Sequence, residues 1–477
     1  MRCAARHRRS SALVAVLLAL ATPAHTAELL IRDASVVDGT GTPPRRGVSI
    51  LVRDGRIAEV APEIDAPGAT ELDARGTTVL PGLVDAHVHL LFAPGSGFRG
   101  DSRETIRELN AQHLRAYLAS GVTTILEAGT TAEEARWVQS WLAAGNPGPR
   151  YLTTGPYVRP EGGYGAPLFG TETTPADVEA KLDLLQSLNV AGVKLAIQEG
   201  TADFAPELRD AVVAGAKRRG LPLYVHATSE ETQGKALDLG AHALMHAPMG
   251  GILATEPFGS ADVTPGYVAR MKASGAYQLT TFSVIDNWPG LFDPQVLDDP
   301  LVIRTVPDVE RATARDPASE RYFAEDLFGW IVPWMPKTLR PWLARLAFRR
   351  SELLESLAYS QRNVLALHRA GVPIVVATDA PSPWTASSTH FHGPTTLREV
   401  ELLGQAGLTP LEAITAATGN PARMLGLADE IGTVEVGKRA NLLIVDGDPS
   451  RDLRDLRRVR WTVKDGLART PQEWMAH

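Results

Sequence analysis

The sequence of 477 residues predicts an α/β protein: a (β/α)8 TIM-type barrel with a small β-sandwich domain formed from both termini. Between residues 81 and 429, eight apolar, strand-like runs alternate with helices or connecting segments, which is the pattern of a barrel. The flanking segments 28–80 and 430–477 are rich in short strands, so we expect them to pair into the small domain. A doubly wound open sheet is the alternative that the strand pattern leaves open.

Both flanking segments consist of short alternating runs broken by turns. On the N-terminal side the runs are LLIRDASVVDG, VSILVRDGRIAEV and TTVLPG, and Asp54-Gly55 predicts a two-residue hairpin turn. On the C-terminal side, the same pattern of short alternating runs and turns appears in GTVEVGKRANLLIVDGD and RVRWTVKDGLA. In the barrel region, Thr174 followed by Pro175 predicts the start of a helix, as an N-cap and a first-turn residue.

Residues 1–27 have the organisation of a secretory signal peptide. Arginines come first, an apolar run follows over 11–20, and small residues stand around Ala24 and Ala27. The run is shorter than the ~20 apolar residues that a membrane span requires, although an N-terminal anchor remains the alternative. We therefore expect an exported protein, periplasmic or secreted. The single cysteine, Cys3, lies in this segment, which excludes disulfides and thiol catalysis from the mature chain.

Composition narrows the class of protein further. Hydrophobic residues make up 44% and charged residues 22%, which is typical of a soluble globular enzyme. The formal charge of -7 leaves no basic footprint for nucleic acid. No later segment resembles a transmembrane helix, so we expect a small-molecule substrate and no stable membrane insertion of the mature chain. Assembly into a homo-oligomer stays open.

One long insertion interrupts the barrel at about 286–350, between the seventh strand and the following helix. It contains several prolines and many aromatic residues, among them Trp288, Phe292, Phe328, Trp330, Trp334 and Trp342. A segment of this length after a barrel strand lies on the catalytic face and can act as a lid. A packed accessory pair of helices without a catalytic role is the other interpretation.

The placement of histidines carries most of the functional information. His87 and His89 alternate on the first barrel strand, so their side chains project to the same side and can share one divalent cation. Such a pair alone is weak evidence for a metal site, because two histidines at this spacing often occur by chance. Four further residues, each within or at the end of a different apolar strand, strengthen the interpretation: Lys194, His226, His246 and Asp379. A barrel brings the carboxyl ends of its strands together, so these residues converge on one pocket.

In this order, the residues resemble the metal-binding signature of the amidohydrolase superfamily. The segments that carry the resemblance are PGLVDAHVHLL, GVKLAI, YVHAT, ALMHAP and VVATDAP, with TPLEAITAATGNPARMLGL and GTVEVGKRANLLIVDGDP in the tail. The sequence is most similar to the imidazolonepropionase-like branch, which includes dipeptidases that cleave before proline. The resemblance extends from about residue 28 to the C-terminus.

The resemblance implies a binuclear metal site. His87, His89 and Asp379 would hold the buried ion, and His226 and His246 the more exposed one. Lys194 would bridge the two ions after carbon dioxide carboxylates its amine. The chemistry of the residues agrees, since an ammonium cannot ligate a metal and is costly to bury beside two cations. If Lys194 were an ordinary buried lysine, the site would hold one metal. Zinc is the usual ion for nitrogen and carboxylate ligands.

We expect hydrolysis of an amide or peptide bond, in a dipeptide, an N-acyl amino acid or a cyclic amide. A metal-bridging hydroxide would attack the carbonyl, because metal binding lowers the pKa of water to about 7. Asp379 would accept the proton and deliver it to the leaving amine. An esterase, lactonase or carbamate hydrolase with the same site is the first alternative, and a non-catalytic binding protein on this fold is the second.

Residues of the loops at the catalytic face are candidates for contact with substrate: Tyr157, Arg159, Tyr164, His390 and His392. Two features depart from the family pattern, namely Tyr164, where relatives carry histidine, and Leu126-Glu127, where many carry arginine and aspartate. The departures bear on specificity or packing and not on the metal ligands. We expect His113, His242 and His368 to be packed or solvated residues without a role in the site.

Overall fold

The computed structural model describes residues 28–165, 167–249, 262–288, 291–331, 335–340, 342, 349–382 and 388–476. The predicted signal peptide, 1–27, lies outside these residues, as do parts of the predicted insertion. Within the described part of the chain, each helix is too short or too polar to cross a lipid bilayer.

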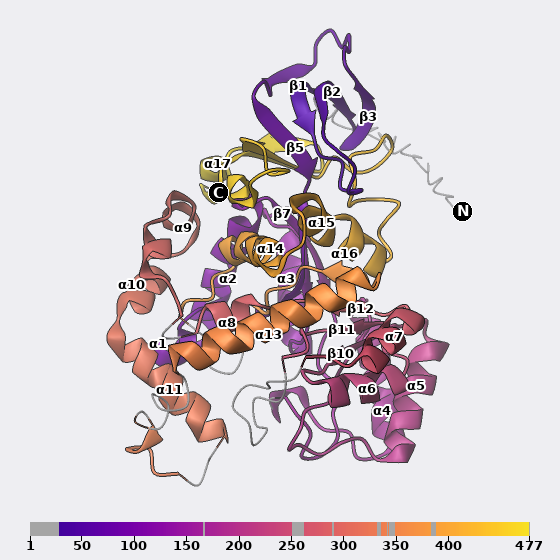
Figure 1. Ribbon diagram of the computed structural model, residues 1–477, viewed down its shortest axis with the longest axis vertical. Coiled ribbons are helices and arrows are strands. Elements are labelled where there is room, and N and C mark those ends of the chain that lie inside the picture. The colour runs from indigo at the N-terminus through magenta and orange to yellow at the C-terminus, as the bar shows by residue number, and fades with distance from the viewer. Residues whose placement is uncertain are drawn as a thin grey trace, which may run out of the picture.

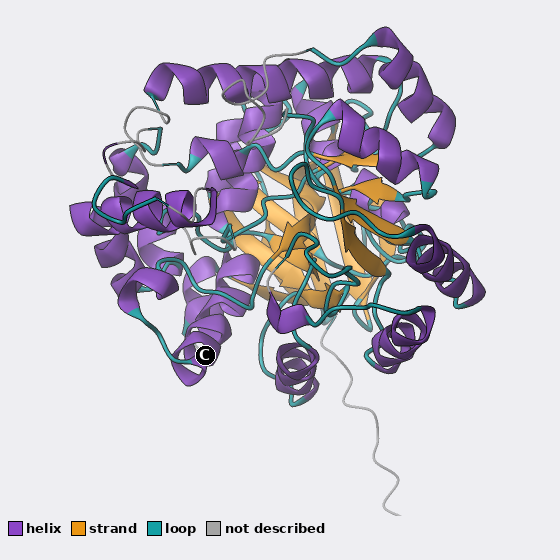
Figure 2. Cartoon of the chain, turned by 90° about the horizontal axis from the view of Figure 1, so that it is seen from below, coloured by secondary structure: helices purple, strands orange, loops and turns teal. Residues whose placement is uncertain are grey.

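Eight parallel strands form the centre of the molecule, each from one of the predicted apolar runs. They are β6 (Leu83–Val88), β7 (Val122–Glu127), β8 (Arg150–Thr153), β9 (Val193–Ala196), β10 (Leu223–His226), β11 (Ala243–Leu244), β12 (Tyr277–Leu279) and β13 (Ile374–Val375). They pair in two runs, β6-β7-β8 and β9 to β13 in order. Figure 2 shows the strands at the centre, surrounded by helices.

Main-chain hydrogen bonds connect the two runs and close the barrel. Ala86 N donates to Val376 O at 3.1 Å, which joins β6 to the end of β13. Ala191 N donates to Thr153 O at 2.8 Å, which joins the approach to β9 to β8. The predicted (β/α)8 fold class is thereby confirmed.

A helix follows each barrel strand and covers its outer side. These helices are α2 (Arg103–Ala119), α3 (Ala132–Ala143), α4 (Pro175–Ser187), α5 (Pro206–Arg218), α6 (Glu230–Asp238), α7 (Pro265–Ser274), α13 (Arg350–Arg369) and α14 (Pro394–Ala406). The start of α4 confirms its prediction, because the Thr174 side chain accepts from Asp177 N while Pro175 occupies the first turn. Loss of such a cap costs about 1 kcal/mol.

Strand alternation decides which side chains reach the inside of the barrel. Val193 and Leu195 of β9 belong to the large apolar cluster between strands and helices, whereas Lys194 between them points inward. In β10, Val225 belongs to the same outer cluster, and Tyr224 belongs to the cluster that fills the barrel. Polar residues on the inward faces are therefore surrounded by strands and buried.

The two chain termini contribute to one eight-stranded sheet. Its strands are β1 (Leu29–Val36), β2 (Arg45–Arg53), β3 (Arg56–Ala61), β4 (Thr70–Asp73), β5 (Thr77–Pro81), β14 (Leu442–Asp446), β15 (Val459–Lys464) and β16 (Leu467–Arg469). They run in the order β16-β15-β14-β5-β1-β2-β3, with β4 beside β1, so the antiparallel β5–β14 pair joins the two ends of the chain. Asp54 and Gly55 both have positive φ between β2 and β3, which confirms the predicted hairpin turn.

This terminal sheet lies at one end of the barrel (Figure 1). One apolar cluster joins Ile31 and Ile50 of the N-terminal strands to Leu442 and Ile444 of the C-terminal strands. Gly82 N donates to Asn441 O at 2.8 Å, immediately before β6 begins. The sheet therefore supports the amino ends of the barrel strands and leaves the carboxyl ends open for a site.

The predicted insertion forms short helices against the barrel. They are η2 (Pro294–Asp298), α9 (Pro300–Thr305), α10 (Asp308–Arg315) and α11 (Pro317–Ile331). Glu310 of α10 contacts His113 of α2, with 2.8 Å between Oε1 and Nε2, and both side chains are buried. Arg99 donates to Thr313 Oγ1 at 3.2 Å. These contacts pack the helices of the insertion against the barrel, as the accessory-helix interpretation expects. A role as a lid stays a prediction. The side chains of Phe328, Trp330 and Trp334 lie outside the described part.

Shorter helices complete the chain. They are α1 (Ser96–Arg99), η1 (Pro167–Phe169), α8 (Ser283–Asp286), α15 (Pro410–Ala416), α16 (Gly419–Met424), η3 (Leu453–Arg457) and α17 (Pro471–Met475). The C-terminal α17 packs Trp474 against Leu118 and Ala119 of α2.

Candidate active site

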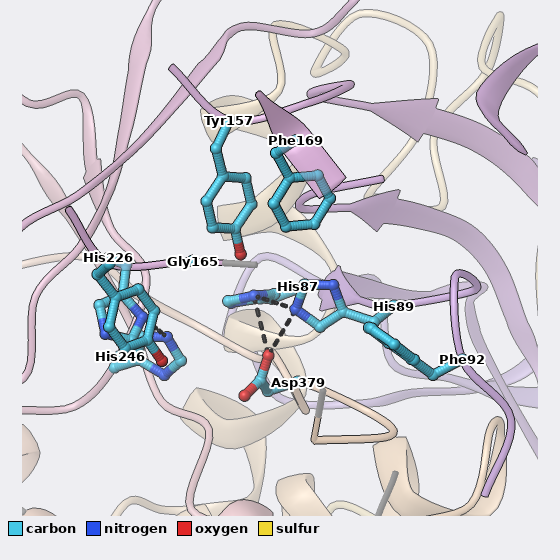
Figure 3. Close-up of a pocket in the computed structure, with 10 residues that line it drawn as sticks. His87, His89, Phe92, Tyr157, Gly165, Phe169, His226, His246 and Asp379 are labelled. Atoms are coloured by element: carbon cyan, nitrogen blue, oxygen red, sulfur yellow. Dashed lines mark hydrogen bonds and ion pairs between the residues drawn. The ribbon is translucent and has the colours of Figure 1, made fainter. Parts of the chain in front are cut away.

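A cavity at the carboxyl ends of the barrel strands gathers most of the predicted site residues (Figure 3). Its lining consists of His87, His89, Phe92, Tyr157, Tyr164, Gly165, Phe169, His226, His246 and Asp379. All four predicted histidine ligands and Asp379 are therefore in one place. They are buried, with at most 6% of each residue exposed, so water does not screen their interactions.

The first group of ligand atoms consists of His87, His89 and Asp379. Asp379 Oδ1 lies 3.0 Å from His87 Nε2 and 2.9 Å from His89 Nε2, and the two nitrogens are 3.2 Å apart. The other ring nitrogens, both Nδ1, lie 3.2 Å from Met245 O and Gly129 O, respectively. Since a carbonyl oxygen only accepts, each Nδ1 carries a hydrogen, so a ring in its neutral form presents the lone pair of Nε2.

This first group needs a cation. Burial, together with the nearby charge of Lys194, lowers the pKa of His87 to about 4, so its ring is neutral at pH 7. Two ring lone pairs and a carboxylate oxygen then face one another without a hydrogen between them. Such an arrangement of acceptors is unfavourable unless a positive ion lies among them, which fits a divalent metal.

The second group consists of His226 and His246. His226 Nδ1 lies 2.7 Å from His246 Nε2. Their other nitrogens face side chains: His226 Nε2 donates to Gln198 Oε1 at 2.9 Å, and His246 Nδ1 lies 3.1 Å from Thr281 Oγ1. Burial lowers the pKa of both rings well below the usual value, so they too are available as neutral ligands.

The two groups adjoin one another inside the cavity. The rings of His87 and His246 have centroids 5.0 Å apart. Ligand atoms of His87, His246 and Asp379 all lie within 4.8 Å of one another. These three residues could hold one metal ion between them.

Lys194 lies fully buried beside both groups. Its Nζ has no hydrogen-bond partner among the residues that the structure describes, and it lies 5.7 Å from the centroid of the Tyr157 ring. Burial lowers the pKa of Lys194 to about 7, against the opposing effect of the Asp379 charge. A buried ammonium without a partner is costly, so a neutral amine or an anionic carbamate suits this position.

The turn that carries Asp379 is held from behind by His390. Asp379 has φ 63°, a left-handed conformation that is uncommon outside glycine. His390 Nδ1 accepts from Ser382 N at 3.1 Å, and its Nε2 lies 3.2 Å from Ser283 Oγ. His390 thus fixes the chain that follows Asp379 and does not belong to the cavity lining.

The other predicted substrate residues divide into two sets. Tyr157 and Tyr164 line the cavity, with the Tyr164 ring stacked on His226 at 4.2 Å between centroids and the Tyr157 hydroxyl pointing toward the histidines (Figure 3). Arg159 and His392 lie outside the lining. Arg159 donates to Gly163 O at 2.6 Å, and His392 Nδ1 contacts the Tyr117 hydroxyl at 2.8 Å. Contact of these residues with substrate stays a prediction.

Several residues that shape the site were not identified as site residues from the sequence. Gln198 had a weak signal, because its even spacing from Lys194 continues the inward face of β9. Thr281 and Gly129 had no signal in the sequence, since their contacts depend on neighbouring strands. A Cβ atom on Gly129 would lie 1.9 Å from Tyr157 Cε1, so only glycine leaves room for this tyrosine.

The remaining departures and histidines have packing roles. Leu126 belongs to the apolar cluster inside the barrel, and the buried Glu127 carboxylate accepts from the Tyr151 hydroxyl. His242 Nε2 contacts Met424 O at 2.8 Å, and His368 forms an ion pair with Glu412.

Comparisons with known proteins agree with this geometry. Residues 78–248 and 345–468, more than half of the chain, match the Amidohydrolase family. Imidazolonepropionase from Salmonella heidelberg is 24% identical over 412 residues, which cover 84% of this chain and 86% of that protein. N-acyl-D-aspartate deacylase from Alcaligenes xylosoxydans xylosoxydans is 41% identical over only 63 residues, so the match spans 13% of this chain and 12% of that relative.

Solved structures share the fold over nearly the whole chain. A Xaa-Pro dipeptidase with bound methionine has a TM-score of 0.69 at 23% identity, covering 93% of this chain and 100% of the other. A molinate hydrolase has a TM-score of 0.67 at 20% identity, covering 94% and 95%. The predicted resemblance, including its branch, is confirmed by these matches.

Proposed function

The chain belongs to the amidohydrolase family and is a metal-binding hydrolase, and from this premise we propose that it cleaves an amide or peptide bond of a small molecule with two divalent metal ions. The observation that carries the proposal is the convergence of two pairs of histidine ring nitrogens beside Asp379, near a buried lysine without a partner among the described residues. The names of the relatives cover different substrates, so they do not choose one for this chain.

Two sets of residues would hold the ions. His87, His89 and Asp379 would bind one, and His226 and His246 the other. Lys194, as a carbamate, would supply an oxygen to each ion; its pKa of about 7 supports the proposal, because carboxylation requires the neutral amine. Nitrogen and carboxylate donors in this number favour zinc.

Divalent ions bound there would polarise the scissile carbonyl and make water a nucleophile at neutral pH. Asp379 has one oxygen, Oδ1, directed at the two histidines, while its Oδ2 lies outside those contacts (Figure 3). Oδ2 can therefore take a proton from the attacking water and pass it to the leaving nitrogen. An amide nitrogen leaves poorly unless it is protonated, so this transfer is needed more for amides than for esters.

Tyr157 is the second group with a place in the reaction. Burial raises the pKa of its hydroxyl, so the group stays protonated and remains a hydrogen-bond donor. Since the hydroxyl points into the cavity, it can donate to the carbonyl oxygen as negative charge develops there.

A substrate screen tests the proposal. Zinc-loaded protein is incubated with dipeptides, N-acyl amino acids, cyclic amides and neutral anilides, beside protein treated with a chelator and matched esters of the same acyl groups. We expect cleavage of at least one amide by the loaded protein and none by the chelated protein. Cleavage of esters alone would favour the esterase alternative, and metal content far below one ion per chain would favour a binding protein.

Export is a separate proposal, based on residues 1–27 of the sequence. Fractionation of producing cells should place the protein outside the cytoplasm, with an N-terminus near residue 28. A cytoplasmic protein that retains Met1 would contradict it.

A further inference from the structure

The walls of the catalytic cavity are aromatic and carry no counter-charge for a substrate anion. Tyr157 and Phe169 stack with centroids 4.6 Å apart, Tyr164 covers His226, and Phe92 adds a further ring. Among the described residues, neither arginine nor lysine lines the cavity, and the buried Lys194 Nζ lies 5.7 Å from the centroid of the Tyr157 ring. The walls therefore suit a flat or apolar group.

Positively charged side chains lie near the segments that form the cavity walls, but each donates a hydrogen bond to a main-chain carbonyl of those segments. Arg159 donates to Gly163 O at 2.6 Å, Lys181 donates to Phe169 O at 2.6 Å, and Arg103 donates to Leu91 O at 2.6 Å. Lys181 also forms an ion pair of 2.8 Å with Glu172. These contacts hold the loops that present the aromatic rings, and all three cations lie outside the cavity lining.

The segments 250–261 and 383–387, which follow the sixth and eighth barrel strands along the chain, contain neither lysine nor arginine. Arg345 is the one arginine between 341 and 348.

Resting on the proposed function, we propose that the part of the substrate bound in this cavity is uncharged and apolar or aromatic, so the enzyme prefers neutral amides to substrates with a carboxylate beside the scissile bond. A carboxylate inside these walls would lose its hydration without gaining a partner, which is unfavourable. A carboxylate that instead reached the predicted metal positions would take the place of the scissile carbonyl and inhibit cleavage. A free dipeptide is therefore a poor substrate.

Three matched anilides and one dipeptide test this inference on the zinc-loaded holoenzyme. The anilides are benzanilide, its analogue with a carboxylate on the benzoyl ring, and its analogue with a carboxylate on the aniline ring; the dipeptide is Phe-Pro. We expect kcat/KM for at least one carboxylated anilide to fall at least about tenfold below benzanilide, neither to exceed it, and Phe-Pro to be cleaved poorly.

The outcomes separate this inference from the proposed function. If both carboxylated anilides match benzanilide, or if Phe-Pro is cleaved and no anilide is, the inference is overturned while amide hydrolysis stands. If none of the four compounds nor any amide of the wider screen is cleaved, the proposed function fails and the inference with it.

A charge placed in the wall provides a second test. Phe92 lines the cavity and is half-buried, whereas Leu168 is 48% exposed and lies outside the lining. Phe92→Arg should narrow the ratio of kcat/KM between the neutral and the carboxylated anilide several-fold, and the control Leu168→Arg should leave the ratio unchanged. An unchanged ratio in a folded Phe92→Arg protein would contradict the inference, and if that variant does not fold, the wild-type panel still decides.

Discussion

The two halves of the metal site are supported in different ways. In the half formed by His87, His89 and Asp379, the outer ring nitrogens donate to main-chain carbonyls, those of Met245 and Gly129. In the half formed by His226 and His246, the outer nitrogens contact side chains, the Gln198 amide and the Thr281 hydroxyl. Each acceptor fixes which ring nitrogen presents its lone pair to the cavity.

The difference teaches where the site is vulnerable. A main-chain acceptor stays in place when a side chain changes, so the first half tolerates most single substitutions around it. A side-chain acceptor disappears with one substitution, so the second half can lose its orientation without any change in its ligands.

The largest effect is expected from Asp379→Asn, which removes a ligand and the proton carrier of the first half together. Turnover should fall by at least about 10³-fold, since general acid–base groups contribute up to about 10⁴-fold. Circular dichroism should show an unchanged fold, because an amide fits the same space. Activity close to that of wild type would remove Asp379 from the proton transfer.

A smaller but still large effect is expected from Gly129→Ala, where a new side chain can disturb a main-chain acceptor. The new Cβ collides with the Tyr157 ring and displaces it or the Gly129 carbonyl that holds His89. We expect kcat/KM to fall by about 10²-fold, the size of a lost oxyanion donor. Gly145→Ala is the matched control, since Gly145 also has positive φ but nothing within 4 Å. Equal activity of the two variants would contradict the account.

Gln198→Met sharpens the contrast by removing only the acceptor of the second half. The affinity for the second metal ion should fall about 10- to 100-fold, as for other lost partners of ligand histidines, while the first ion stays bound. Zinc titration of each variant measures this, with Gln139→Met as control, because Gln139 donates to Leu188 O on the outer side of the barrel. Equal weakening of both ions would erase the distinction between the halves.

Lys194 lies between the halves and gives the smallest effect, one on stability. Its pKa is lowered from 10.5 to about 7, so between these values the unfolded chain binds a proton that the folded chain does not. The free energy of unfolding of metal-free protein should therefore rise with pH in this range, by at most about 1.4 kcal/mol per pH unit. Urea unfolding of wild type and Lys194→Met in carbonate-free buffer measures the difference. Parallel pH profiles would show that Lys194 is not buried as described.

The sequence was sufficient to predict the features that depend on strand order and residue spacing. The eight barrel strands, the Asp54-Gly55 turn and the N-cap at Thr174 all follow from local patterns, and the order of the ligand residues brought His87, His226 and Asp379 to one end of the barrel. The structure also shows these residues together in one cavity.

The supporting contacts could not be predicted, because they join residues that are distant in sequence. Gln198 and Thr281 meet their histidines across neighbouring strands. The Arg159 guanidinium donates to the carbonyl of Gly163 in its own loop, and its contact with substrate stays a prediction. His390 follows the eighth strand, as a substrate contact would, yet a bend in the chain turns it toward Ser382. Loop conformation decides these positions, and spacing does not reveal it.

Metal stoichiometry tests the central claim most directly. Metal-free protein is titrated with zinc in bicarbonate buffer, and bound zinc is counted per chain for wild type and Lys194→Met. We predict two ions per chain in wild type and one or fewer in the variant, because the carbamate that joins the halves cannot form. One ion or fewer in wild type, or two ions in both proteins, would contradict a site built from two histidine pairs around Lys194.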